Sequence, residues 1–228
     1  MKNTHRLILG LLITFIIFAA ATVAGRNITL GNNFIPSSFF IHTVMLIFSV
    51  GAIAILRKYV PFRIAWPRFK TIWKPILFGF LTTVIVNITL NVFTMAAGFK
   101  PEAHPLLTAS TPLQTFLFIF IYASIAEEIL MRGFLQNFLH PLKARGIHLF
   151  KHTISLPVII GAVAFGLIHL ILFTTGVGTL FVVRTVIFTT ILGLFAGYYQ
   201  EKHNNHAYAI IVHMAGNLMG VFGALLMH

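Results

Sequence analysis

Two adjacent carboxylates, Glu127 and Glu128, are the residues of this sequence that most clearly could do chemistry. The chain has only four acidic residues, and these two stand in a stretch, Leu113 to Leu139, that is otherwise mostly apolar. The stretch is long enough to cross a bilayer as a helix, which takes about 20 residues. Carboxylates inside such a helix are costly in free energy, so we interpret them as functional.

Only one of the two carboxylates has a predicted partner in its own helix. Arg132 follows Glu128 by four residues, so the two side chains share a helical face and can form an ion pair. Glu127 is turned about 100° away around the helix axis, and its partner must come from another helix. A buried carboxylate that no neighbouring cation neutralises is suited to act as a general base.

Two histidines and an asparagine are further polar groups inside apolar segments. Of the eleven histidines, His169 and His213 lie well within such segments, whereas His42 is near the end of one and is predicted at the membrane interface. Asn217 follows His213 by one turn, so the two side chains point the same way. Structural roles stay open: His169 could bond a backbone carbonyl, and His213 with Asn217 could simply join helices.

The predicted depths of these groups favour a shared site. We take the inner ends of the three segments at Leu139, Pro157 and Asn205. Glu127 and His169 then each lie twelve residues from the inner end, and His213 and Asn217 lie eight and twelve residues from theirs. At 1.5 Å per residue, all four are roughly 12–18 Å from the inner surface. The segments alternate in direction, so equal depth does not follow from sequence order. We therefore predict one polar chamber in the inner half to the middle of the membrane.

The composition identifies the elements that must position these groups. Hydrophobic residues make up 58% of the 228 residues, charged residues only 9%, and the mean hydropathy is +0.93. Soluble domains have about 25% charged residues. We predict an all-α, polytopic membrane bundle, with residues 1–228 as one membrane domain. Its seven apolar segments are about Leu7–Ala24, Phe39–Leu56, Ile76–Phe99, Leu113–Leu139, Leu156–Phe173, Thr179–Tyr199 and Ala207–Met227.

The basic residues predict the orientation. Twelve of them fall on one side if the N-terminus is cytoplasmic, against Arg26 and Lys100 on the other. Such an excess marks the cytoplasmic side, so the N-terminus is predicted inside, the C-terminus outside, and the cell membrane as the location. The net charge of +12 is thereby explained by topology, and we expect no nucleic-acid partner. The chain has no cysteine, which excludes disulfides and thiolate metal sites.

Three motifs on successive polar-bearing segments resemble those of a known family. They are Glu127-Glu128-x-x-x-Arg132, Phe165-x-x-x-His169 and His213-x-x-x-Asn217. This order is similar to that of the CPBP family of intramembrane proteases, also called Abi, whose members include the type II CAAX prenyl proteases. The resemblance covers Leu113 to Gly220, which would be the catalytic core.

The resemblance implies that the chain hydrolyses peptide bonds inside the membrane. Glu127 matches the family's water-activating glutamate, and His169 the histidine that shares this water. His213 and Asn217 match the pair thought to stabilise the oxyanion. In the first motif, Glu128 and its partner Arg132 match a supporting pair. The expected partners are the bilayer and a peptide or protein substrate, either prenylated or a secreted-peptide precursor, entering from the membrane or the cytoplasm.

Other interpretations stay open. No cofactor is required if Glu127 activates water directly, but Glu127, His169 and His213 could instead bind zinc with an open position for water. Asn217 is not a usual zinc ligand, which favours the metal-free mechanism. Glu127 and His169 could also relay protons in a coupled transporter. A non-catalytic immunity protein of the same fold is a further alternative.

Overall fold

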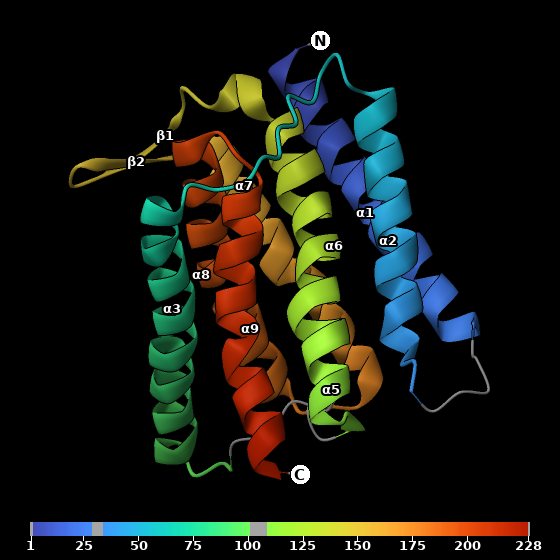
Figure 1. Cartoon of the computed structure of the whole chain (residues 1–228), viewed down its shortest axis with the longest axis vertical. Helices are drawn as coiled ribbons and strands as arrows, with labels where there is room; N and C mark the ends of the chain where they lie inside the picture. The colour runs from blue at the N-terminus through green and yellow to red at the C-terminus, as the bar shows by residue number, and fades with distance from the viewer. Residues whose placement is uncertain (1, 29–33, 101–108, 228) are drawn as a thin grey trace.

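The computed structural model describes residues 2–28, 34–100 and 109–227 of the chain. Within these residues, seven helices are long and apolar enough to cross a membrane, as the sequence predicts. Figure 1 shows them as one bundle, with the two termini at opposite ends. The helices are α1 (Asn3–Asn27), α2 (Ser37–Ile55), α3 (Phe69–Ala96), a composite fourth span (Pro112–Gln136), a composite fifth span (Leu156–Thr175), α8 (Thr179–His203) and α9 (Ala207–Met227).

The fourth span departs from a regular α-helix. It begins with α5 (Pro112–Gln114), where Thr111 and Gln114 form a capping box and Pro112 occupies the first turn. The π-helical η1 (Thr115–Ala123), the α-helical α6 (Ser124–Glu128) and the π-helical η2 (Ile129–Gln136) follow. Both predicted carboxylates therefore lie on a short α-helical stretch between two π-helical ones, and π-helical turns are frequent at functional sites.

The fifth span changes character at a predicted site residue. Ser155 caps α7 (Leu156–Ile168) by accepting a hydrogen bond from the Val158 amide. The α-helix ends at Ile168 and continues as the 3-10 helix η4 (His169–Thr175), which stops at Gly176 with φ of +81°. His169 thus stands at the junction between two helix types, and not in the middle of a regular helix as expected.

The fourth span occupies the middle of the bundle. It packs against α2 on one side and α9 on the other, while α3 packs on α9 and α7 on α8. Its inner half is buried, with Phe134, Leu135 and Phe138 fully covered. Figure 1 shows the fourth span in this place between α2 and α9.

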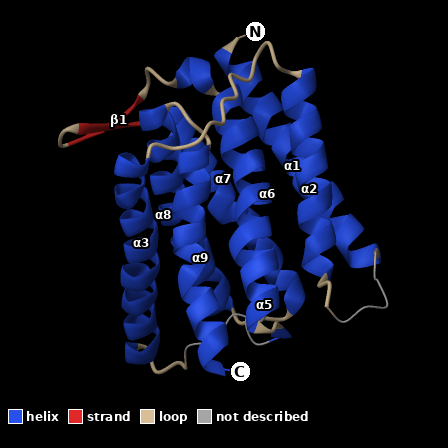
Figure 2. Ribbon diagram, in the orientation of Figure 1, coloured by secondary structure: helices blue, strands red, loops and turns tan. Residues whose placement is uncertain are grey.

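A small β-hairpin follows the fourth span. The short helix η3 (His140–Leu142) leads into β1 (Gly146–Leu149) and β2 (His152–Ser155), which pair antiparallel. Figure 2 shows the hairpin projecting sideways from the end of the bundle that holds the N-terminus. These two strands were not predicted from the sequence.

Candidate active site

Glu128 links two of the predicted site residues. Its Oε1 accepts hydrogen bonds from Arg132 Nη1 and from His213 Nδ1, both at 2.8 Å. Glu128 and Arg132 are fully buried, so the predicted ion pair is present in a dry environment. Since Nδ1–H of His213 donates to Glu128, the opposite ring nitrogen, Nε2, is turned away from this pair.

Glu127 lies between two imidazoles from different helices. Its Oε2 is 3.7 Å from Nε2 of His213 on α9, and its Oε1 is 3.2 Å from Nε2 of His42 on α2. Glu127 therefore has the expected partner from another helix, and it has two of them, His213 and His42. Each carboxylate oxygen of Glu127 faces one ring.

His42 was assigned the wrong environment by the sequence. It is buried and contacts Glu127, whereas we expected an interfacial residue. A signal was present: Ser38, His42, Met45 and Ser49 form the buried stripe of α2, at spacings of one helical turn. A histidine in a stripe of small polar residues on an apolar helix is a candidate for an interhelical contact.

His169 joins the site through an aromatic contact. Its Nδ1–H donates to the Phe165 carbonyl at 2.8 Å, which leaves Nε2 as the acceptor nitrogen. The Phe165 ring lies edge-on to both His169 and His213, with centroid distances of 5.1 and 5.4 Å. The carbonyl bond that we weighed as an alternative role is thus present together with proximity to the site.

Asn217 approaches the site from α9 and contacts α6. Its Nδ2 donates to Ser124 Oγ at 3.0 Å. Ser124 is buried one turn before Glu128. The hydroxyl of Ser124 therefore fixes the carboxamide that belongs to the third motif.

A comparison with protein families concerns the second half of the chain. Residues 109–219 match the family model described as type II CAAX prenyl endopeptidase Rce1-like. This part of the chain is similar to that family. The resemblance inferred from the three motifs is confirmed, and the family is one of membrane proteases. No curated protein and no solved structure matches the chain.

All six predicted site residues fall within the Rce1-like segment, whereas His42 lies outside it. The structure brings together Glu127, Glu128 and His213 through direct contacts or near-contacts. It joins His169 and Asn217 to them through Phe165 and Ser124 respectively.

Arg132 is held tightly on its other sides. Its guanidinium carbon lies 4.6 Å from the centroid of the Phe165 ring. A Cβ at Gly193 would come within 2.4 Å of Arg132 Nη2, so only glycine leaves room for the guanidinium. The cation is therefore fixed between α7 and α8 and anchors Glu128 in one orientation.

A buried hydrogen-bond network continues from Arg132 toward the end of the bundle that holds the N-terminus. Gln200 Nε2 donates to the Arg132 carbonyl and to Asn137 Oδ1, and Gln200 Oε1 accepts from His206 Nδ1. His206 lies between α8 and α9. Burial, and secondarily the charge of Arg132, lower the pKa of His206 to about 3. His206 is therefore a neutral structural histidine.

The donor types of the site would suit zinc, but their arrangement in this conformation does not. No group of three or more histidine, aspartate or glutamate side chains in the described part of the chain is arranged to hold a metal ion. The 3.7 Å between Glu127 Oε2 and His213 Nε2 is close to the roughly 3.4 Å that separates two tetrahedral ligands at zinc distances. What the described residues lack is a third donor directed at the same point.

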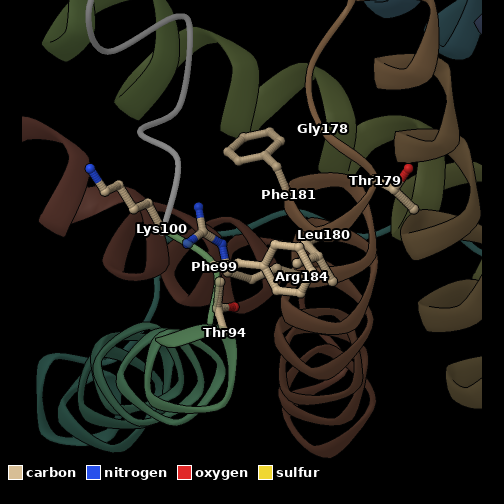
Figure 3. Close-up of a pocket in the computed structure, with 8 residues that line it drawn as sticks. All are labelled: Thr94, Phe99, Lys100, Gly178, Thr179, Leu180, Phe181 and Arg184. Atoms are coloured by element: carbon tan, nitrogen blue, oxygen red, sulfur yellow. The ribbon is translucent and has the colours of Figure 1, made fainter. Parts of the chain in front are cut away.

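A cavity is also present outside the candidate active site. It has a volume of about 390 Å³ between α3 and α8 (Figure 3) and is lined by Thr94, Phe99, Lys100, Gly178, Thr179, Leu180, Phe181 and Arg184. None of the six predicted site residues lines it. Arg184 donates to Asn91 and lies beside the Phe181 ring, so this cavity is separate from the candidate active site.

Proposed function

We propose that this protein hydrolyses peptide bonds within the membrane with a water molecule activated by Glu127. The observation that carries the proposal is the arrangement of Glu127, His213 and Glu128 inside a segment that matches the Rce1-like family. Among the described residues no lysine or arginine forms an ion pair with Glu127, so its carboxylate is the candidate general base.

The reaction begins when Glu127 takes one proton from water. The resulting hydroxide forms a bond to the carbonyl carbon of the peptide, and the carbonyl oxygen gains a negative charge. Glu127 then returns the proton to the amide nitrogen as the C–N bond breaks. His169, whose Nε2 is an acceptor, would hold the second hydrogen of the water. This sequence needs no serine or cysteine nucleophile.

The oxyanion would be stabilised by Asn217 and His213. Asn217 Nδ2 has two hydrogens, one donated to Ser124, and the second is available to the substrate. Because Nδ1–H of His213 is committed to Glu128, Nε2 can donate only when the ring is doubly protonated. Glu128 supplies the counter-charge for that form. Donors placed where charge develops account for about 3–4 kcal/mol each in well-studied hydrolases.

We propose a membrane-anchored substrate. A prenylated cysteine followed by a short C-terminal peptide fits the family match, since the lipid keeps the scissile bond close to the bilayer. An apolar segment of a secreted-peptide precursor is the second class. Either could reach a site within the bundle laterally from lipid or from the cytoplasmic side.

The test uses purified protein in proteoliposomes and quenched fluorescent peptides. One peptide carries a farnesylated cysteine before three C-terminal residues, and a second is an apolar peptide without the lipid. We expect cleavage of at least one, and loss of about 100-fold or more in Glu127→Gln, the scale of general-base catalysis. Glu201→Gln, the same change at a glutamate bonded to Ser155, serves as control and should retain activity.

The other outcomes separate the alternatives. Full activity of Glu127→Gln would refute the mechanism. Loss of wild-type cleavage on chelation, restored by zinc, would favour the zinc-dependent form with Glu127, His169 and His213 as ligands. Proton uptake into the liposomes without cleavage would favour a coupled transporter, and neither activity would favour a non-catalytic role such as immunity.

A further inference from the structure

We propose that His42 positions the Glu127 carboxylate for catalysis, so that the active site includes a residue from α2. The inference deepens the proposed function and rests on it. It assigns a role to a helix that precedes the segment matched by the Rce1-like family.

The contact between His42 and Glu127 is direct and largely shielded from solvent. Nε2 of His42 lies 3.2 Å from Oε1 of Glu127, and the side chains are 11% and 17% exposed. Water therefore does not compete strongly for either group. A hydrogen bond to an ionised carboxylate under such conditions is roughly twice as strong as a neutral one.

The other ring nitrogen of His42, Nδ1, indicates which of the two nitrogens carries the proton. Nδ1 is buried and has no hydrogen-bond partner among the described residues. The single polar contact of the ring is thus the one to Glu127, and the proton on the imidazole is best placed on Nε2. An ionisable residue inside an apolar bundle is costly in free energy, so a histidine that makes one polar contact there is interpreted as functional.

His42 is not needed merely to attach α2 to the fourth span. The next residue, Thr43, already joins the two helices, since its Oγ1 lies 2.8 Å from the hydroxyl of Tyr122. The Phe39 ring of α2 also packs against Phe118 and Tyr122 of the fourth span. The His42 bond is therefore available for a purpose other than cohesion.

That purpose follows from the two oxygens of Glu127. With Oε1 held by His42, rotation of the carboxylate is blocked and Oε2 stays turned toward His213. Oε2 is then the oxygen that accepts the proton from water, on the side where His213 donates to the oxyanion. His42 acts through Glu127 and needs no contact with substrate, which makes it a positioning residue.

The test compares His42→Ala, His42→Gln and the matched control Thr43→Val with the peptides described above. His42→Ala should lower kcat by about 100-fold, the cost of misplacing a reacting group by about 1 Å, with little change in KM. His42→Gln places an amide donor near the position of Nε2 and should recover most of kcat. Thr43→Val loses the neighbouring interhelical bond and should keep both constants.

Three kinetic results would overturn the inference. These are an unchanged kcat in His42→Ala, an equal loss of kcat in His42→Gln and His42→Ala, or an equal loss in Thr43→Val. The last would show that loosening α2 is sufficient to lower the rate.

A double-mutant cycle separates this inference from the proposed function. The apparent Tm shifts of His42→Ala and Glu127→Gln should be non-additive, because the residues contact each other. Additive shifts would overturn the contact. If the wild-type protein cleaves neither peptide, the proposed function is wrong. If the Tm shifts of His42→Ala and Glu127→Gln are nevertheless non-additive in that inactive protein, the contact exists but does not serve catalysis, and the inference is overturned.

Discussion

At the scale of single residues, the site is organised by imidazoles whose two nitrogens do different things. In His213, Nδ1–H donates a hydrogen bond to Glu128 and Nε2 faces Glu127. In His169, Nδ1–H donates to a backbone carbonyl. In both cases the first bond fixes the ring and leaves the second nitrogen for chemistry. Catalytic and structural roles are thus combined in one side chain.

His206 gives a prediction for pH. Its pKa is about 3 in the folded protein and about 6.5 when unfolded. The unfolded state therefore binds more protons between these values, and stability falls as pH falls through this range. From pH 7 to 5 we expect a loss of about 2 kcal/mol from this residue alone.

The measurement is the apparent Tm in detergent at pH 7 and pH 5. His206→Gln removes the titrating group and should reduce the drop in Tm, although it is less stable at pH 7. The exposed His140, changed to glutamine, should leave the drop unchanged. An identical drop in wild type and His206→Gln would contradict the assignment.

At the scale of elements, close helix packing sets the position of His213. A Cβ at Gly79 of α3 would come within 2.3 Å of the Val212 carbonyl, and Thr83 one turn later donates to the Gly216 carbonyl at 2.7 Å. Backbone contact of this kind depends on small residues in membrane helices. The backbone just before His213 therefore rests directly on α3.

Gly79→Ala should consequently push α9 away from α3 and weaken the site. We expect a loss of about 1–3 kcal/mol, typical of overpacking, and a lower kcat. Gly51→Ala on α2 is the matched control, because a Cβ there meets nothing within 4 Å. Apparent Tm and peptide cleavage measure both effects, and equal behaviour of the two variants would contradict the packing argument.

The elements also show what could be predicted from sequence. The seven spans follow from long apolar segments, and the Glu128–Arg132 pair from a spacing of four. The π-helical parts of the fourth span were not predicted, because a continuous apolar segment predicts a helix without distinguishing its type. His42 was missed for a related reason, since its partner is 85 positions away in the sequence.

At the scale of the whole molecule, an odd number of spans places the termini at opposite ends of the bundle (Figure 1). The direction in which the bundle is inserted remains a prediction from the twelve-to-two distribution of basic residues. It decides from which side a water-soluble substrate segment reaches the site.

The absence of cysteine allows a direct test of orientation. Lys151→Cys lies in the exposed turn of the hairpin and Lys100→Cys at the opposite end. A membrane-impermeant maleimide should label Lys100→Cys on intact bacterial cells, and Lys151→Cys only after the membrane is opened, because basic ends stay cytoplasmic. The reverse pattern would contradict the predicted topology.

The position of Glu127 between α2 and α9 has a consequence for fragments of the protein. A fragment limited to the Rce1-like half would carry every recognisable motif and still lack one of the two rings that grip the carboxylate. Under the proposed mechanism such a fragment would have a reduced kcat. Adding the missing amino-terminal helices, even as a separate polypeptide, should restore it.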